Sequence, residues 1–434
     1  MTGVRLAVGI VALEFAAAVT GFVASTLLPV VADDLDARDS LGLLIAGSSL
    51  GLFVALPLAS RVLARLGPRG TLAAGMIAYL SGLLLAAMSR TAWMFALGQF
   101  SAGLASGLLA VFGISSAIRH LDDRLRIRVV AASSAMWIVP ALVGPAATLG
   151  LEHLVGWRWT LLLPVPFVLF GRLLVVRATR GSRDSTEVPR PLLRTLTVPL
   201  GAACVVFSKG FWPIALAGAA ITVVGMIAIL PAGTARLRPG TPAALGAMVL
   251  FAIGYFGADS LITVLLTSGF GVSLGEAAIV LSAAPLGWAV TSLVATRLAS
   301  TYLPVVGLSL TALGTAVLAF GGSFTVALVA WTLAGIGVGL AYPGLYIRAT
   351  TAGSSGFSAA ELATAVITAE CVGQLLGRAV GGALSSTGTG LLASYALFAV
   401  ALAAAAIAAF RLPPEECAGR RLGRQRAVNP EATE

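Results

Sequence analysis

Leu58-Ala-Ser-Arg-Val-Leu-Ala-Arg-Leu-Gly-Pro-Arg-Gly-Thr-Leu72 carries three arginines and no acid, and its Gly67-Pro68 pair interrupts any helix passing through it. Long apolar runs without a polar face flank it, from Leu41 to Leu58 and from Thr71 to Met88. This pattern predicts two membrane-spanning helices joined by a tight basic loop, and the arginines place that loop in the cytoplasm.

The composition of the whole chain agrees with a membrane protein. Of its 434 residues, 58% are hydrophobic and 11% are charged, whereas soluble domains carry about 25% charged residues. The net charge of +10 comes from residues in short loops between apolar runs rather than on one face. The sequence therefore predicts an all-α polytopic membrane protein and argues against a nucleic-acid partner.

Apolar runs long enough to cross a bilayer recur along the chain. In the first half they predict spans at about 6–32, 41–60, 71–89, 92–117, 129–150 and 158–177. In the second half they predict spans at about 243–267, 276–298, 303–321, 324–347, 358–385 and 390–411. The first run is too long for a signal peptide and Glu14 interrupts it, so we expect a retained first helix.

The distribution of arginines predicts that both termini are cytoplasmic. The expected cytoplasmic loops of the first half hold Arg61, Arg65, Arg69, Arg119, Arg124, Arg126 and Arg128, and the outer loops hold Arg38, Arg90 and Arg158. Two six-helix halves of this kind suit a transporter that rocks between two states.

Between the halves, the chain predicts a basic connector and an extra transmembrane hairpin formed by the apolar runs 192–207 and 211–230. The first run is short, so a re-entrant or interfacial segment remains an alternative. We expect four parts: an N-terminal bundle (1–178), a connector with hairpin (179–242), a C-terminal bundle (243–412) and a disordered tail (413–434).

Ionisable residues inside predicted spans are the functional candidates, because a charge in the bilayer costs about 2.5–3.5 kcal/mol on insertion scales. Four stand out: Glu14, Asp259, Glu370 and Arg378. Burial favours the neutral form of Asp259, so a carboxylate facing the central cavity could take up and release protons. For Asp259 the alternative is a purely structural hydrogen bond to a neighbouring helix. Glu14 lies nearer the interface and could snorkel, and Glu370 and Arg378 could belong to a structural network.

Other polar and aromatic residues complete the candidate cavity. Gln374 lies between Glu370 and Arg378 on one helical stripe, where it or water could bridge groups about 12 Å apart along the axis. Tyr255, Phe256 and Trp137 are aromatic cavity candidates. Five other tryptophans lie mainly near predicted span ends, and for most of them we expect a position in the interfacial belt rather than ligand stacking: Trp93, Trp157, Trp159, Trp212 and Trp288.

The sequence offers no sign of enzymatic chemistry. No His/Cys/Asp cluster, phosphate loop or activated nucleophile is apparent, so we expect no catalytic residues, metal or cofactor. The cysteines Cys204, Cys371 and Cys417 have no metal-like or paired spacing.

Several motifs resemble the major facilitator superfamily. Ala64-Arg65-Leu66-Gly67-Pro68-Arg69 resembles the loop motif between its second and third helices, in which Arg65, Gly67 and Arg69 fit and Ala64 replaces an aspartate linked to gating. Gln99 stands in the fourth-helix motif, where an arginine linked to proton transfer is often found.

Further motifs resemble efflux members of that superfamily. Gly144-Pro145 is retained from the fifth-helix motif of antiporters, and Gly156-Trp157-Arg158-Trp159 resembles a signature of drug-efflux members. Phe256-Gly-Ala-Asp-Ser260 resembles a bacterial branch with two additional central helices, in which Asp259 stands where a glutamate is usual.

The resemblance implies a secondary transporter of fourteen helices in the bacterial inner membrane. It would export small hydrophobic or cationic compounds in exchange for protons, as a monomer. A uniporter or symporter for a specific metabolite is the second possibility, and a non-transporting membrane sensor is the third.

Overall fold

The computed structural model describes residues 2–120, 138–178, 192–208, 211–295, 298, 302–350, 359–385 and 390–411. Throughout these ranges the regular structure is helical and contains no strand, which confirms the predicted fold class. The first half comprises α1 (Thr2–Asp34), α2 (Leu41–Ala87), α3 (Ala92–His120), α5 (Ile138–Val155), α6 (Trp157–Thr160) and α7 (Val165–Ala178).

The central pair and the second half follow in chain order. The central pair is α8 (Leu192–Phe207) and α9 (Trp212–Ile229). The second half comprises α10 (Thr241–Val264), α11 (Leu274–Ala295), α12 (Leu303–Phe320), α13 (Phe324–Thr350), α14 (Ala359–Leu384) and α15 (Gly390–Phe410). A five-residue π-helical segment, Leu265–Gly269, continues α10.

The helix α2 is two predicted spans joined at the basic loop. Its φ/ψ values are helical except at Gly67, where φ is 64° and ψ is 177°. Glycine adopts this left-handed region without the steric cost that a Cβ brings. The hydroxyl of Thr71 donates to the Gly67 carbonyl at 2.8 Å and holds the first turn of the second segment.

Nine helices in the described ranges are long and apolar enough to cross a membrane. Shorter apolar helices occupy Leu142–Val155, Leu196–Phe207 and Pro213–Ile229. At 1.5 Å per residue, the 16 residues of α8 and the 18 of α9 are about 24 and 27 Å long, slightly less than a hydrocarbon core of about 30 Å. That the hairpin crosses the bilayer twice stays a prediction.

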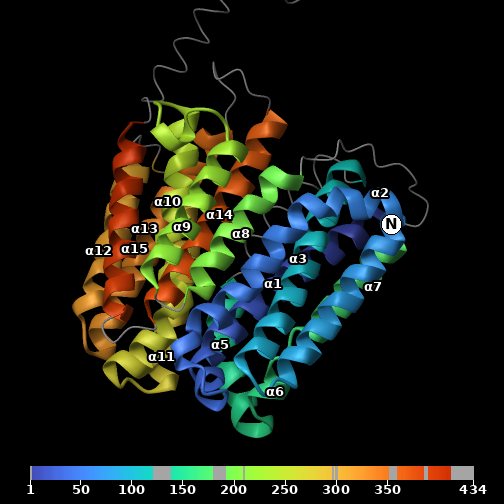
Figure 1. Cartoon of the computed structure of the whole chain (residues 1–434), viewed down its shortest axis with the longest axis horizontal. Coiled ribbons are helices and arrows are strands. Elements are labelled where there is room, and N and C mark those ends of the chain that lie inside the picture. Colours follow the sequence, from blue (N-terminus) through green and yellow to red (C-terminus); the bar gives the residue numbers. More distant parts are fainter. Residues whose placement is uncertain are drawn as a thin grey trace, which may run out of the picture.

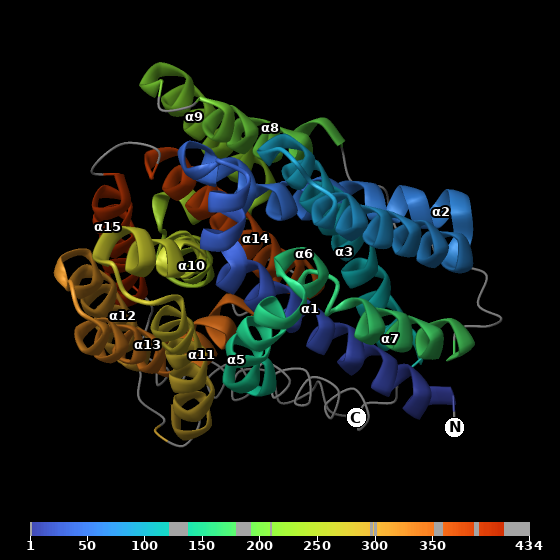
Figure 2. The same ribbon diagram turned by 90° about the horizontal axis from the view of Figure 1, so that it is seen from below.

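The helices form two bundles with the hairpin on one side of the seam between them. The second-half helices α10, α12, α13 and α15 lie together, and α1, α2, α3 and α7 form the other group (Figure 1). Seen from below, α8 and α9 lie against α2 and α14 at one edge, while α5 lies beside α11 at the opposite edge (Figure 2).

The two bundles are in tight contact at one end of the molecule, which we call the turn end because it holds the turn Leu35–Ser40. The opposite end, which holds the start of α1 and the end of α15, is the termini end. At the turn end the backbones of Gly42 and Gly382 meet so closely that a Cβ on Gly42 would lie 2.9 Å from the Gly382 carbonyl carbon. Nearby, the Thr263 hydroxyl donates to the Ser25 carbonyl at 2.7 Å, from α10 to α1.

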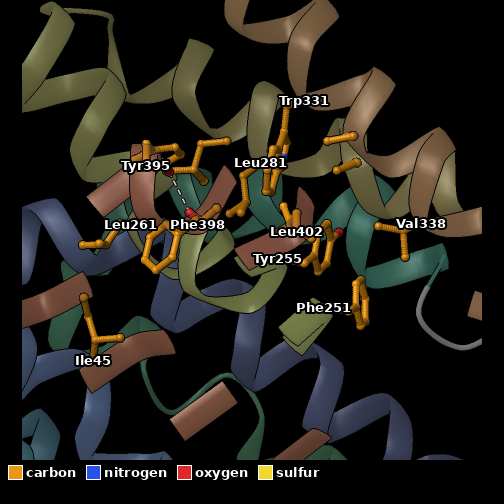
Figure 3. Close-up of a cluster of buried hydrophobic side chains, with 14 of the residues drawn as sticks. Ile45, Phe251, Tyr255, Leu261, Leu281, Trp331, Val338, Tyr395, Phe398 and Leu402 are labelled. Atoms are coloured by element: carbon orange, nitrogen blue, oxygen red, sulfur yellow. Dashed lines mark hydrogen bonds between the residues drawn. The ribbon is translucent and has the colours of Figure 1, made fainter. Parts of the chain in front are cut away.

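The core of the second bundle is an aromatic and aliphatic layer around α10. Tyr255 stacks on Trp331 with ring centroids 5.4 Å apart, and both side chains are buried (Figure 3). The Tyr395 hydroxyl donates to the Ala258 carbonyl at 2.6 Å, and this bond is dashed in Figure 3. A Cβ on Gly257 would collide with the Phe398 ring, so α15 packs directly on the backbone that precedes Asp259.

Candidate functional site

Asp259 lies on α10, the helix that packs against the most neighbours in the second bundle. Its side chain is half-buried, whereas Ala258 and Ser260 on either side are buried. The Ser260 hydroxyl donates back to the Gly257 carbonyl at 2.7 Å. Together with the Tyr395 bond to Ala258, this contact fixes the helix on both sides of the carboxylate.

Arg378 connects the two bundles. It lies on α14, and its Nη1 donates to the Ser49 hydroxyl on α2 at 2.7 Å. Asp259, on the neighbouring helix α10 of the same bundle, lies within range of the Arg378 charge, but these two described side chains form no ion pair. The Arg378 Nε is buried and has no hydrogen-bond partner among the described residues. The Arg378 guanidinium thus donates to a hydroxyl of the other bundle, and the Asp259 carboxylate of its own bundle acts on it only through its charge.

Glu370 lies two turns before Arg378 on the same helix and has a different partner. The Tyr342 hydroxyl on α13 donates to Glu370 Oε1 at 2.5 Å. Tyr346, one turn further along α13, has its ring centroid 6.0 Å from that of Tyr342. The sequence indicated that Glu370 and Arg378 are too far apart to touch, and in the structure each indeed contacts a different helix. Gln374, half-buried between them, has the same helical register.

An aromatic cluster contributed by α10, α11 and α13 lies next to Glu370. Its members are Phe251, Tyr255, Phe256, Trp288, Trp331, Tyr342 and Tyr346. The Trp288 ring is 5.2 Å from the Tyr342 ring and 5.7 Å from the Tyr255 ring, between centroids. Tyr255 is an interior member at 2% exposure, whereas Tyr346 is 39% exposed at the edge.

The prediction of a belt position for Trp288 is wrong. Trp288 lies in the middle of α11 (Leu274–Ala295) and its ring packs edge-on to Tyr255. Trp157 is buried as well, at 5% exposure, whereas Trp93 and Trp159 are exposed as a belt requires. The predicted span 276–298 already placed Trp288 near its middle, whereas the burial of Trp157 at the start of its span could not be read from position alone.

Gln99, Gly144 and Pro145 lie on helices of the first bundle. Gln99 is buried on α3. A Cβ added to Gly47 of α2 would lie 3.3 Å from the Gln99 Cβ, so Gln99 packs against α2 within the first bundle. Gly144 and the buried Pro145 lie on α5, where a Cβ on Gly144 would contact Phe22 of α1 at 3.3 Å.

Among the other predicted residues, the structure describes the side chain of Arg65 but not those of Arg69, Glu14 and Trp137. Arg65 is exposed beside the Gly67 kink, while the side chains of Arg69 and Glu14 lie outside the described part of the chain. Trp137 also lies outside the described residues.

Sequence reasoning missed a buried cation in the first bundle. Arg172 lies on α7 with 0% exposure, and none of its three side-chain nitrogens has a hydrogen-bond partner among the described residues. The signal was present, because Arg172 interrupts the apolar run predicted as a span at 158–177. Tyr342 was also missed, although it and Tyr346 are one helical turn apart within a predicted span.

The structure therefore defines a polytopic helical membrane protein of two bundles with a polar site near the seam between them. The chain belongs to the Major Facilitator Superfamily, whose family model matches residues 10–351. It is a transporter of that family, consistent with the resemblance in its loop and helix motifs.

Two curated relatives are described as efflux proteins. The chain is 26% identical over 399 residues to the "Probable multidrug-efflux transporter Rv1634" of Mycobacterium tuberculosis, covering 83% of this chain and 84% of that protein. It is 21% identical over 171 residues to the "Multidrug efflux pump SdrM" of Staphylococcus aureus, spanning 39% of this chain and only 38% of that protein.

Solved structures confirm the fold. A D-xylose-proton symporter superposes with a TM-score of 0.63 at 13% identity, covering 95% of this chain and 97% of that one. The nucleoside transporter NupG superposes with a TM-score of 0.62 at 15% identity, covering 94% and 99% of the two chains.

Proposed function

We propose that this transporter exports small hydrophobic or cationic compounds in exchange for protons. The observation that carries the proposal is the position of Arg378, which donates to Ser49 in the other bundle and lies on α14, the helix packed against α10 with its Asp259. A protonatable group thereby lies near a side chain that makes one of the contacts between the two bundles.

This arrangement predicts how the protonation state of Asp259 changes the conformation of the transporter. When Asp259 is ionised, it attracts Arg378 into the second bundle and competes with Ser49. When Asp259 is protonated, that attraction is lost and the hydrogen bond to Ser49 becomes the main interaction of the guanidinium. Protonation therefore favours closure at the turn end, and deprotonation favours opening there.

This direction fits proton-driven export if the turn end faces outward, as the arginine distribution predicts. A proton loads from outside, the turn end closes, and the proton leaves to the cytoplasm. The ionised transporter then binds its substrate from the inside and opens outward. In this account the described state, with Gly42 against Gly382, is closed to the outside.

The substrate preference follows from the aromatic cluster and its carboxylate. Half-buried Trp288 and Tyr342 offer ring faces that attract cations and apolar groups. Glu370, which accepts the Tyr342 hydrogen bond, supplies a negative charge beside those rings. A hydrophobic cation satisfies both features, and the multidrug-efflux descriptions of the relatives support this class.

The proposal includes a bacterial inner-membrane location with both termini cytoplasmic, a monomeric state, protons as the driving ion and no other cofactor. Uniport or symport of one metabolite is the second candidate, and buried Gln99 favours it. A neutral amide cannot replace an arginine in a proton relay that uses the first bundle.

The test is drug accumulation in an efflux-deficient bacterial host, with and without a protonophore. It compares the native chain with Asp259→Asn at matched expression, and Asp36→Asn is the control. Asp36 is exposed at the turn end with φ 47°, a conformation that asparagine tolerates.

We expect the native chain and the control to lower accumulation, and the effect to vanish with Asp259→Asn or the protonophore. Equal accumulation for all chains across a broad panel of compounds would contradict multidrug export and favour the metabolite reading.

A further inference from the structure

A cavity of about 310 Å³ lies at the termini end, where α9 is followed by the loop that leads to α10. Its apolar wall is the last turn of α9, formed by Met226, Ile227 and Leu230. Its polar wall is the loop 231–236 together with Arg238. The cavity is remote from Asp259, which lies in the second half of α10.

The loop is held in one conformation by its own hydrogen bonds. Gly233 has φ 96° and Leu237 has φ 48°, so the chain turns sharply twice within five residues. The Thr234 hydroxyl donates to the Pro231 carbonyl at 2.7 Å, and the Arg238 amide donates to the Gly233 carbonyl at 3.2 Å. The polar wall of the cavity therefore has a defined backbone conformation.

The polar wall carries positive charge without nearby acid. Arg236 and Arg238 are exposed, and neither forms an ion pair with another residue of the described ranges. A third arginine joins them, because Arg411 Nη1 donates to the Leu237 carbonyl at 3.4 Å. Along the sequence, no aspartate or glutamate occurs between Glu187 and Asp259.

The apolar wall continues into a surface suited to lipid. Ile227 is 51% exposed and Val224, one turn earlier on α9, is 65% exposed. Exposed apolar side chains on a membrane helix face acyl chains. The cavity thus lies at the boundary between an apolar helix surface and a group of arginines. A phospholipid at the membrane interface has the matching order, with acyl chains on one side and a charged headgroup on the other.

We propose that this cavity binds the headgroup of an anionic phospholipid. The phosphate lies against Arg236 and Arg238, and the acyl chains follow the exposed face of α9. A bound lipid ties the end of the hairpin to the start of α10. Because α8 packs against both α2 and α14, the lipid stabilises the hairpin beside the seam between the bundles.

The test is lipid binding to the purified full chain, followed by native mass spectrometry and thermal unfolding in detergent. The probes are phosphatidylglycerol, phosphatidylcholine and inorganic phosphate. The variant is Arg236→Gln with Arg238→Gln. The control is Arg61→Gln with Arg65→Gln, which removes two arginines at the same end away from the cavity.

We expect phosphatidylglycerol, but not phosphatidylcholine or inorganic phosphate, to bind and raise the unfolding temperature. The variant should weaken phosphatidylglycerol binding about 30-fold, because each arginine contributes about fivefold at an anionic surface. The control should not weaken it. Equal weakening in the control would overturn the site, since it would show a general charge effect. An equal response to inorganic phosphate would overturn the lipid assignment in favour of a free anion.

Discussion

Replacing Gly42 by alanine tests whether the described state is closed at the turn end. The added Cβ would lie 2.9 Å from the Gly382 carbonyl carbon and 3.2 Å from the Ala383 amide nitrogen. Both atoms belong to the backbone of α14, so no side chain can rotate away. Because ordinary contact begins at 3.4 Å, the helices must separate locally by about half an ångström, as overpacked sites require.

The expected shift follows from the cost of overpacking. Extra atoms in a packed interface cost about 1–3 kcal/mol. If the clash is relieved when the turn end opens, the closed state loses that free energy relative to the open one. The equilibrium then moves toward the open state by a factor of about 5 to 150.

The assay is the rate of labelling of Ile45→Cys by a membrane-impermeant maleimide. Ile45 is 8% exposed in the core cluster that joins the two bundles, so a thiol there reacts when the turn end opens. The background chain has its three native cysteines replaced by serine. The control is Gly150→Ala on α5, because a Cβ there meets nothing within 4 Å.

We expect Gly42→Ala to speed labelling by the stated factor and Gly150→Ala to leave the rate unchanged. An unchanged rate in Gly42→Ala, in a chain that still folds and inserts, would refute the reasoning that this contact closes the turn end.

Three more predictions concern individual side chains. Ser49→Ala removes the acceptor of Arg378 across the seam, and we expect at least tenfold faster labelling in the same assay, since a hydrogen bond to a charged group contributes about 1.5–3 kcal/mol. Tyr342→Phe and Glu370→Gln should each lower thermal stability and show a coupling of about 1–2 kcal/mol in a double-mutant cycle; additive effects would contradict the bond. Arg172→Met should raise the free energy of unfolding by about 1–4 kcal/mol, because it removes a buried cation that has no partner in the described ranges, and a lower value would show that the cation is paired.

The sequence predicted the helices well because the bilayer demands long apolar segments. The predicted span 303–321 is observed as Leu303–Phe320, and 390–411 as Gly390–Phe410. The basic loop at Gly67 is the interruption within α2, as its Gly-Pro pair indicated.

The contacts of the candidate site were harder to predict. The sequence identified Asp259, Glu370 and Arg378 as intramembrane charges, but the partners Ser49 and Tyr342 lie on helices distant in the chain. The periodicity of apolar residues gives little help here. A helix that is apolar on all sides has no sequence pattern that indicates which face packs against which neighbouring helix.

The most direct measurement is proton movement coupled to transport in proteoliposomes that contain the purified chain and a pH-sensitive dye. A hydrophobic cationic compound that the whole-cell test identifies is added under an imposed pH gradient. The account predicts that adding the compound causes protons to cross the liposome membrane, which the dye reports, with the native chain and with Asp36→Asn. It predicts no such proton movement with Asp259→Asn. Compound movement without proton movement, or proton release that persists in Asp259→Asn, would contradict proton-coupled export through Asp259.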